Sequence, residues 1–151
     1  MALFTISAAA LIDTARRHGG AGLHVEAEAP GVSARDAMAL ESATDANATL
    51  LMLLRGLNHV APLCVAGDTV HIALHRGEAL LNASRTGITD DDRLAFQTIA
   101  AIDRSLEMLE RIGVDVAWLA PDSNHAGLAE ADALASRIYD RALATAAAAA
   151  A

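Results

Sequence analysis

The sequence predicts a mainly α-helical domain: a compact bundle of four to five helices, with or without a small two-stranded β-ribbon. Alanine, the best helix former, supplies 37 of the 151 residues. One long segment, Asp90–Ile112, repeats apolar residues at helical spacing without interruption. Glycine and proline divide the rest of the chain into short units. Together these observations favour helices packed on helices.

The first expected helix runs from about Ser7 to His18, and Gly19 is a natural residue to end it. Residues Ala21–Glu28 then alternate between apolar and polar side chains, which is typical of a short strand. A lone strand needs a partner, so this segment is one half of the expected β-ribbon.

A second helix is expected from Ser33 to about Arg55. Ser33 and Asp36 have the spacing of a capping box, and Gly56 is placed to end the helix. The following segment, Leu57–Gly67, shows no clear periodicity and predicts no element.

A third helix is expected from residue 68 or 69 to about Ser84, because Leu80 and Leu81 continue the apolar pattern. The alternative is a strand over Thr69–Leu74, where apolar and polar residues alternate. The sequence leaves both interpretations open.

The strongest prediction is the helix over Asp90–Ile112, with Thr89 as its N-cap. Val114–Ala120 has the alternation of a strand that pairs with Leu23–Ala27, or it belongs to a helix. The last helix is expected to begin at Ser123.

The length fits one helical domain over residues 1–145, followed by an alanine-rich tail over 146–151. The apolar start of the chain has no basic residues before it, so it is interpreted as part of the first helix. No apolar run reaches the length of a membrane span, and a cytoplasmic protein without membrane contact is expected.

The charge balance excludes several functions. The formal net charge is −8, which argues against nucleic acid and against an anionic membrane surface. All 11 basic residues are arginines, so a lysine Schiff base and a phosphate-binding P-loop lysine are both excluded. Cys64 is the only cysteine, so no intrachain disulfide can form.

One group of side chains predicts a metal site. On a helix, His71, His75 and Glu78 lie at positions i, i+4 and i+7 and project from one face. Two imidazoles one turn apart, with a carboxylate as third ligand, suit a divalent transition metal. The same row is also typical of a solvated helix face, and on a strand Glu78 would leave the group.

No complete catalytic set appears in the sequence, and no cofactor other than that metal is indicated. The leading hypothesis is therefore a non-enzymatic helical interaction or regulatory module, an adaptor or chaperone-like protein. The hydrophobic fraction of 54% favours self-association as a homodimer, with a protein partner as the alternative. Two further hypotheses are a metal-binding protein or metal-dependent enzyme using His71, His75 and Glu78, and a small-molecule binder with an apolar pocket near Trp118.

Overall fold

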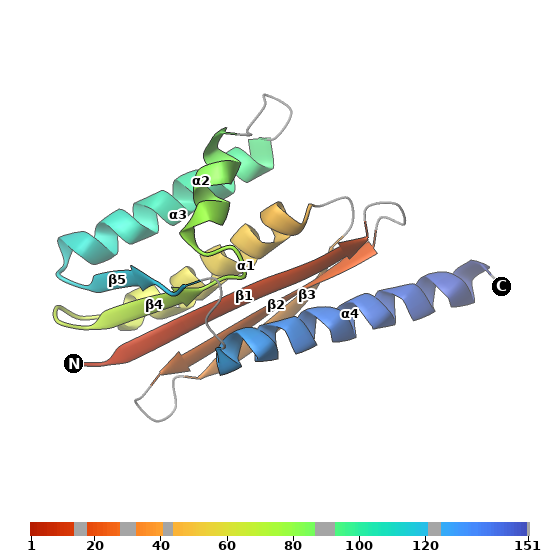
Figure 1. Cartoon of the computed structure of the whole chain (residues 1–151), viewed down its shortest axis with the longest axis horizontal. Coiled ribbons are helices and arrows are strands. Elements are labelled where there is room, and N and C mark those ends of the chain that lie inside the picture. Colours follow the sequence, from red (N-terminus) through yellow and green to blue (C-terminus); the bar gives the residue numbers. More distant parts are fainter. Residues whose placement is uncertain (14–17, 28–32, 41–43, 87–92, 121–124, 151) are drawn as a thin grey trace.

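The computed structural model describes residues 1–13, 18–27, 33–40, 44–86, 93–120 and 125–150. Over these residues the fold is α/β, with a five-stranded mixed sheet and four α-helices (Figure 1). The expectation of a mainly α-helical bundle is therefore wrong. Among the described residues, no helix combines the length and hydropathy needed to cross a bilayer.

The strands of the described residues are β1 (Leu3–Asp13), β2 (His18–Ala27), β3 (Ala34–Leu40), β4 (Thr69–Ala73) and β5 (Asp115–Trp118). They lie in the order β3-β2-β1-β4-β5. The first three strands form an antiparallel meander, whereas β4 pairs parallel with both β1 and β5. Since β4 stops opposite Ser7, the second half of β1 continues past the carboxyl end of its parallel neighbour.

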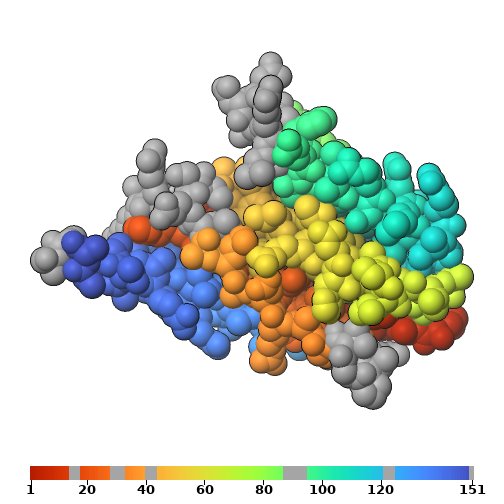
Figure 2. All heavy atoms as spheres, turned by 180° about the vertical axis from the view of Figure 1, so that it is seen from behind, coloured from red at the N-terminus to blue at the C-terminus, as the bar shows by residue number. Residues whose placement is uncertain are grey.

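The helices of the described residues are α1 (Asp45–Val60), α2 (Glu78–Thr86), α3 (Arg93–Arg111) and α4 (Ala126–Ala150), and a 3₁₀ turn (Ala61–Leu63) follows α1. α1 packs on β1 and β2, and α3 packs against α1. α4 crosses the opposite face of the sheet over β1, β2 and β3. Figure 2 shows the molecule from behind, where α1 (yellow) runs between α3 (blue-green) and β3 (orange).

The main hydrophobic core lies between the sheet and α1. It holds fully buried side chains from the strands and from the helices, including Ile6, Ile72, Leu53, Leu57 and Ile102. A second, much smaller cluster of Ala9, Leu128 and Ala131 joins β1 to α4. The small residues on that side of the sheet let α4 approach the strands closely.

The helix expected over Ser7–His18 is wrong, because this segment forms most of β1 and the first residue of β2. Ala8 and Ala9 are both buried, one in the core beneath α1 and the other beneath α4. A central strand covered on both faces has room for such small side chains, and tertiary packing there outweighs the helix propensity of alanine. The strand expected over Ala21–Glu28 is confirmed by β2.

The single helix expected over Ser33–Arg55 is also wrong, because β3 and α1 share this segment. The Thr44 side chain caps α1 by accepting a hydrogen bond from the Asn47 N–H. Asp36 lies in β3, where its carboxylate contacts the Arg55 guanidinium at 2.8 Å, so it is not part of a capping box.

For residues 68–84 the strand interpretation is confirmed and the continuous helix is wrong. Val70 and Ile72 are fully buried in the main core and His71 is only half-buried, which is the alternation of a covered strand. The helix over Asp90–Ile112 is confirmed by α3, although its expected cap, Thr89, lies outside the described residues.

The strand within Val114–Ala120 is confirmed by β5, but its partner is β4 and not Leu23–Ala27. The last helix is confirmed by α4, and its expected start at Ser123 lies outside the described residues. Residues 146–150 continue α4. The division into a domain over 1–145 and a tail stays a prediction.

Candidate functional site

The candidate site is built around a tight turn that follows β4. The Gly77 N–H donates to the Leu74 carbonyl at 3.0 Å, so His75 and Arg76 occupy the two central positions of the turn. Gly77 has a φ of 58°, which favours glycine over any residue with a Cβ. The turn therefore carries both His75 and Arg76, and both are exposed.

His75 is joined to α4 through Asp132. The His75 Nε2 lies 2.7 Å from each oxygen of the Asp132 carboxylate. The two side chains are 58% and 45% exposed, so solvent reaches both. Because a carboxylate only accepts hydrogen bonds, we assign a proton to Nε2, and a neutral imidazole then keeps its lone pair on Nδ1.

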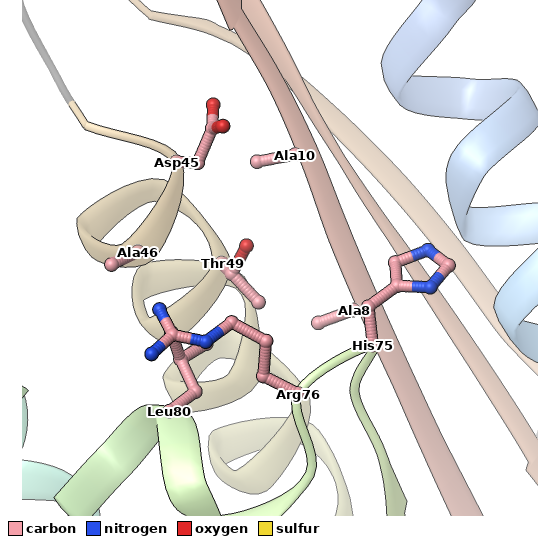
Figure 3. A pocket seen from close by; sticks show the side chains of 8 residues that line it. All are labelled: Ala8, Ala10, Asp45, Ala46, Thr49, His75, Arg76 and Leu80. Carbon is pink, nitrogen blue, oxygen red and sulfur yellow. The ribbon is translucent and has the colours of Figure 1, made fainter. Parts of the chain in front are cut away.

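A pocket of about 300 Å³ opens beside this turn (Figure 3). Its polar lining comes from Asp45, Thr49, His75 and Arg76. Its apolar lining comes from Ala8, Ala10, Ala46 and Leu80. The pocket therefore lies past the carboxyl end of β4, between α1 and the free half of β1.

Two hydrogen bonds fix the α1 wall of this pocket. The Asp45 carboxylate accepts from the Ile12 N–H at 2.9 Å, which ties the first turn of α1 to β1. The Thr44 cap described above holds the same turn. Thr49, one turn further along α1, is 8% exposed and borders the pocket.

Arg76 differs from the other arginines near the sheet. Arg35 pairs with Glu130, Arg55 pairs with Asp36, and Arg85 pairs with Asp103. Among the described residues, Arg76 has no carboxylate partner. Figure 3 shows its side chain reaching across the pocket towards α1, whereas the His75 ring lies on the α4 side. Its positive charge is thus available to an anionic ligand.

The metal set expected from the sequence is not assembled on one helix face. His71 lies within β4, His75 in the turn, and Glu78 at the start of α2. The described residues contain no group of three or more His, Cys, Asp or Glu side chains that could hold a metal ion. Of the three residues, only His75 lines the pocket.

Sequence reasoning missed the other members of the site. Asp132 is 57 residues from His75, and no local spacing connects the two. Thr49 and Arg76 carry no motif of their own. The one available signal was the Gly77 that follows His75 and Arg76, because glycine after exposed polar residues is typical of a turn.

Two other side chains singled out from the sequence lie elsewhere. Burial raises the pKa of the Cys64 thiol to about 11, so this cysteine is not an activated nucleophile. Trp118 is part of β5 and packs against the main core, away from the lining of the pocket described above. An apolar ligand site at Trp118 has no support from this pocket.

The fold is similar to solved RNase H structures. The N-terminal RNase H domain of a Mycobacterium tuberculosis protein, fused to maltose-binding protein, superposes with a TM-score of 0.61 at 15% identity, over 91% of this chain and 98% of that one. RNase H1 of the halophilic archaeon Halobacterium salinarum gives 0.60 at 14% identity, over 92% and 98%. LC11-RNase H1 in complex with an RNA/DNA hybrid gives 0.57 at 14%, over 95% and 99%. No protein-family model and no curated protein matches the sequence.

Proteins of this fold typically use divalent metal ions such as Mg²⁺. Such ions need several carboxylate or other oxygen ligands around one point. Here Asp45 is the one carboxylate among the residues that line the pocket, and it already bonds to the Ile12 N–H. The Asp132 carboxylate lies outside this lining and faces His75. The described residues that line the pocket therefore do not fit a magnesium site.

The comparison also corrects two functional expectations. The non-enzymatic helical adaptor is contradicted, because the chain shares its α/β fold with RNase H domains and is not a helical bundle. The exclusion of nucleic acid is contradicted as well, since a domain of the same fold is known in complex with an RNA/DNA hybrid. A net charge summed over the whole chain does not describe one pocket. The chain has the RNase H-like fold.

Proposed function

We propose that this chain binds nucleic acid duplexes that contain an RNA strand, with the RNA backbone entering the pocket beside His75 and Arg76. The observation that carries the proposal is an arginine without a carboxylate partner beside an exposed histidine, in a pocket of an RNase H-like fold. The guanidinium of Arg76 is suited to a phosphodiester, because it donates hydrogen bonds to the phosphate oxygens.

The position of the pocket supports the same conclusion. In open α/β sheets, ligands bind outside the carboxyl ends of the strands, where neighbouring connections diverge. Here β4 ends in the His75 turn, while its neighbour β1 runs on and turns back into β2. The pocket lies in that opening.

The number of cations at the pocket sets the expected strength of binding. Affinity for a duplex grows with the number of phosphates that cations neutralise, and Arg76 is the one arginine among the lining residues. We therefore expect weak binding with a shallow salt dependence. Recognition would depend on the shape of the RNA strand and its 2′-hydroxyl groups.

The test is fluorescence anisotropy with a labelled RNA/DNA hybrid, at salt concentrations between roughly 50 and 200 mM. Duplex DNA of the same sequence is the competitor. We expect the hybrid to bind more tightly than duplex DNA. We expect Arg76→Gln to weaken binding and to reduce the salt slope by about one unit, as the loss of one phosphate contact does.

The matched control is Arg111→Gln. Arg111 is exposed at the end of α3, next to the loop that leads into β5, and so lies by the amino ends of the parallel strands, opposite the pocket. This variant should bind the hybrid as the wild-type chain does. Absence of hybrid binding, or an equal loss in both variants, would show that the proposal is wrong.

A further inference from the structure

We infer that the pocket binds one unpaired guanine base of the RNA strand, and that Asp45 and Thr49 of α1 recognise its Watson–Crick edge. The inference rests on the proposed function, because an RNA strand must first reach the pocket. It goes beyond contacts to the RNA backbone, since it gives the site a base specificity and names the two side chains that provide it.

The charged side chains divide the pocket into two parts. Arg76 contributes a guanidinium to the lining and Asp45 contributes a carboxylate, and these two side chains form no ion pair with each other. A phosphate suits Arg76 but would meet a like charge beside Asp45. Because a carboxylate only accepts hydrogen bonds, the group that lies against Asp45 should be neutral and should donate them.

The apolar lining suits a flat ring. Figure 3 shows Ala8 and Ala10 of β1 across the pocket from α1. Ala46 and Leu80 complete the apolar lining of a space of about 300 Å³, which is room for one nucleoside. Pockets that take an unstacked base combine apolar walls with hydrogen-bonding groups at the edge of the base.

The Thr49 hydroxyl indicates that a ligand is missing from the pocket. Thr49 is 8% exposed and lines the pocket, and among the described residues its hydroxyl has no hydrogen-bond partner. By contrast, the hydroxyls of Thr86 and Thr145 donate to carbonyl oxygens one turn earlier in their helices. Since a hydroxyl kept from water is costly without a partner, a bound ligand that accepts from Thr49 would supply the missing bond.

The Asp45 carboxylate is held in place beside this hydroxyl. Its Oδ1 accepts from the Ile12 N–H at 2.9 Å, which fixes the orientation of the carboxylate. Each carboxylate oxygen has two acceptor sites, so both oxygens can still accept from a ligand. Asp45 and Thr49 are four residues apart on α1 and therefore lie next to each other on one helix face.

This pair of side chains matches the edge of guanine. That edge presents the O6 acceptor and then two donors, N1–H and the N2 amino group. The Thr49 hydroxyl can donate to O6, while the two Asp45 oxygens accept from N1–H and N2–H. Adenine and cytosine have an acceptor nitrogen in place of N1–H, and uracil has an oxygen in place of the N2 amino group, so a carboxylate repels each of them.

The edge of guanine is accessible only where the base is unpaired. In a continuous hybrid it is hydrogen-bonded to cytosine, whereas a bulged nucleotide can turn its base out of the stack at a lower cost. The expected ligand is therefore a hybrid with an unpaired guanine in its RNA strand, with the adjacent phosphate at Arg76.

The experiment measures the affinity of the full chain for four labelled hybrids by fluorescence anisotropy. Each hybrid carries one unpaired ribonucleotide at the same position, which is guanine, adenine, cytosine or uracil. We expect the guanine hybrid to bind about tenfold more tightly than the other three, as a bidentate base contact allows. Inosine, which lacks only the N2 amino group, should also bind more weakly than guanine. Equal affinity for all four hybrids would overturn the inference.

Asp45→Asn tests the carboxylate without removing its bond to β1. The Ile12 N–H needs an acceptor, so the amide oxygen should turn towards Ile12 and the amide NH₂ towards the pocket. The preference for guanine over inosine should then disappear. Asp115→Asn is the matched control, because Asp115 is exposed at the start of β5, and this variant should keep the preference. An Asp45→Asn variant that still prefers guanine would overturn the inference.

Thr49→Val tests the hydroxyl with a side chain of the same shape. It should weaken binding of the guanine hybrid and leave the adenine and cytosine hybrids unchanged. The Tm should not fall, because the hydroxyl has no partner within the described part of the chain. A lower Tm with an equal loss for all the hybrids would show that Thr49 has only a structural role.

The outcomes separate this inference from the proposed function. Hybrids that bind in an Arg76-dependent manner, but with no preference for an unpaired guanine, overturn the base site and leave the proposed function standing. A chain that binds none of the hybrids overturns the proposed function, and the inference falls with it.

Discussion

Gly22 of β2 and Ala131 of α4 pack backbone against backbone. A Cβ placed on Gly22 would lie 2.1 Å from the Ala131 carbonyl oxygen, closer than any real contact of that kind. Gly20 meets Ala135 in the same way, at 2.2 Å. Two glycines on one face of β2 thus allow α4 to lie close against the sheet. This close approach matters for the candidate site, because α4 also holds Asp132, the partner of His75.

The first prediction follows from this contact. Gly22→Ala should lower the free energy of unfolding by about 3 kcal/mol or more, because the new methyl group meets backbone that has no freedom to move aside. Urea unfolding measures this change. Gly67→Ala is the control: its nearest neighbour would be 3.6 Å away, and only its φ of 93° makes alanine unfavourable. An equal loss in both variants would mean that the close contact with α4 is unimportant.

Ser7 supports a second prediction. It is fully buried in β1, and among the described residues its Oγ has no hydrogen-bond partner. A buried hydroxyl without a partner costs about 1–3 kcal/mol, so Ser7→Ala should raise the free energy of unfolding by about 1 kcal/mol. Urea unfolding at constant m-value tests this. A less stable variant would show that the hydroxyl is satisfied in solution.

The sequence predicted those elements whose apolar periodicity is visible within the segment itself. α3 was found because Ile99, Ile102 and Leu109 are spaced as one helical face, and all three are buried. β1 was missed because its alanines carry a helical propensity, and only the packing of helices on both faces makes the strand favourable. That packing depends on contacts far apart in the chain, which local periodicity does not contain.

The candidate site also depends on contacts that are far apart in the chain. His75 was singled out, but helical spacing joined it to His71 and Glu78, its neighbours in sequence. The structure joins it to Asp132, because the sheet brings the end of β4 and the early turns of α4 together. A rule based on spacing along one helix cannot find a partner on another element.

The third prediction separates stability from function at the His75–Asp132 pair. Both side chains are about half exposed, and exposed ion pairs contribute little to folding. A double-mutant cycle with His75→Ala and Asp132→Ala should give a coupling free energy of at most about 1 kcal/mol in urea unfolding. A much larger coupling would mark the pair as structural.

The fourth prediction concerns acid stability. Backbone N–H groups of Val65 and Ala2 donate to the Asp68 carboxylate, at 2.8 Å each, and hold its pKa below the ordinary value of 3.8. The folded state therefore favours the ionised form. This stabilisation is fully present above the ordinary pKa and is lost as the pH falls through the lower pKa of the folded state.

Asp68→Asn removes that pH-dependent contribution. The variant should melt below wild type at neutral pH, and the difference in Tm should shrink as the pH falls below about 4. Thermal unfolding across this range is the measurement. Glu110→Gln, on the exposed face of α3, serves as the control and should follow wild type at every pH. A constant gap between Asp68→Asn and wild type would contradict this role.

The last prediction tests whether the pocket binds a divalent metal ion. Asp45 is the one carboxylate among its lining residues, which gives such an ion too few charged oxygen ligands. Millimolar Mg²⁺ or Mn²⁺ should therefore leave the Tm of the wild-type chain unchanged. Thr49→Glu combined with Ala10→Asp would add two carboxylates to the pocket lining that holds Asp45, and Mn²⁺ at ten times its Kd should stabilise that variant by about 1.4 kcal/mol. A wild-type chain that gains the same stability from Mn²⁺ would show that the pocket already binds the ion.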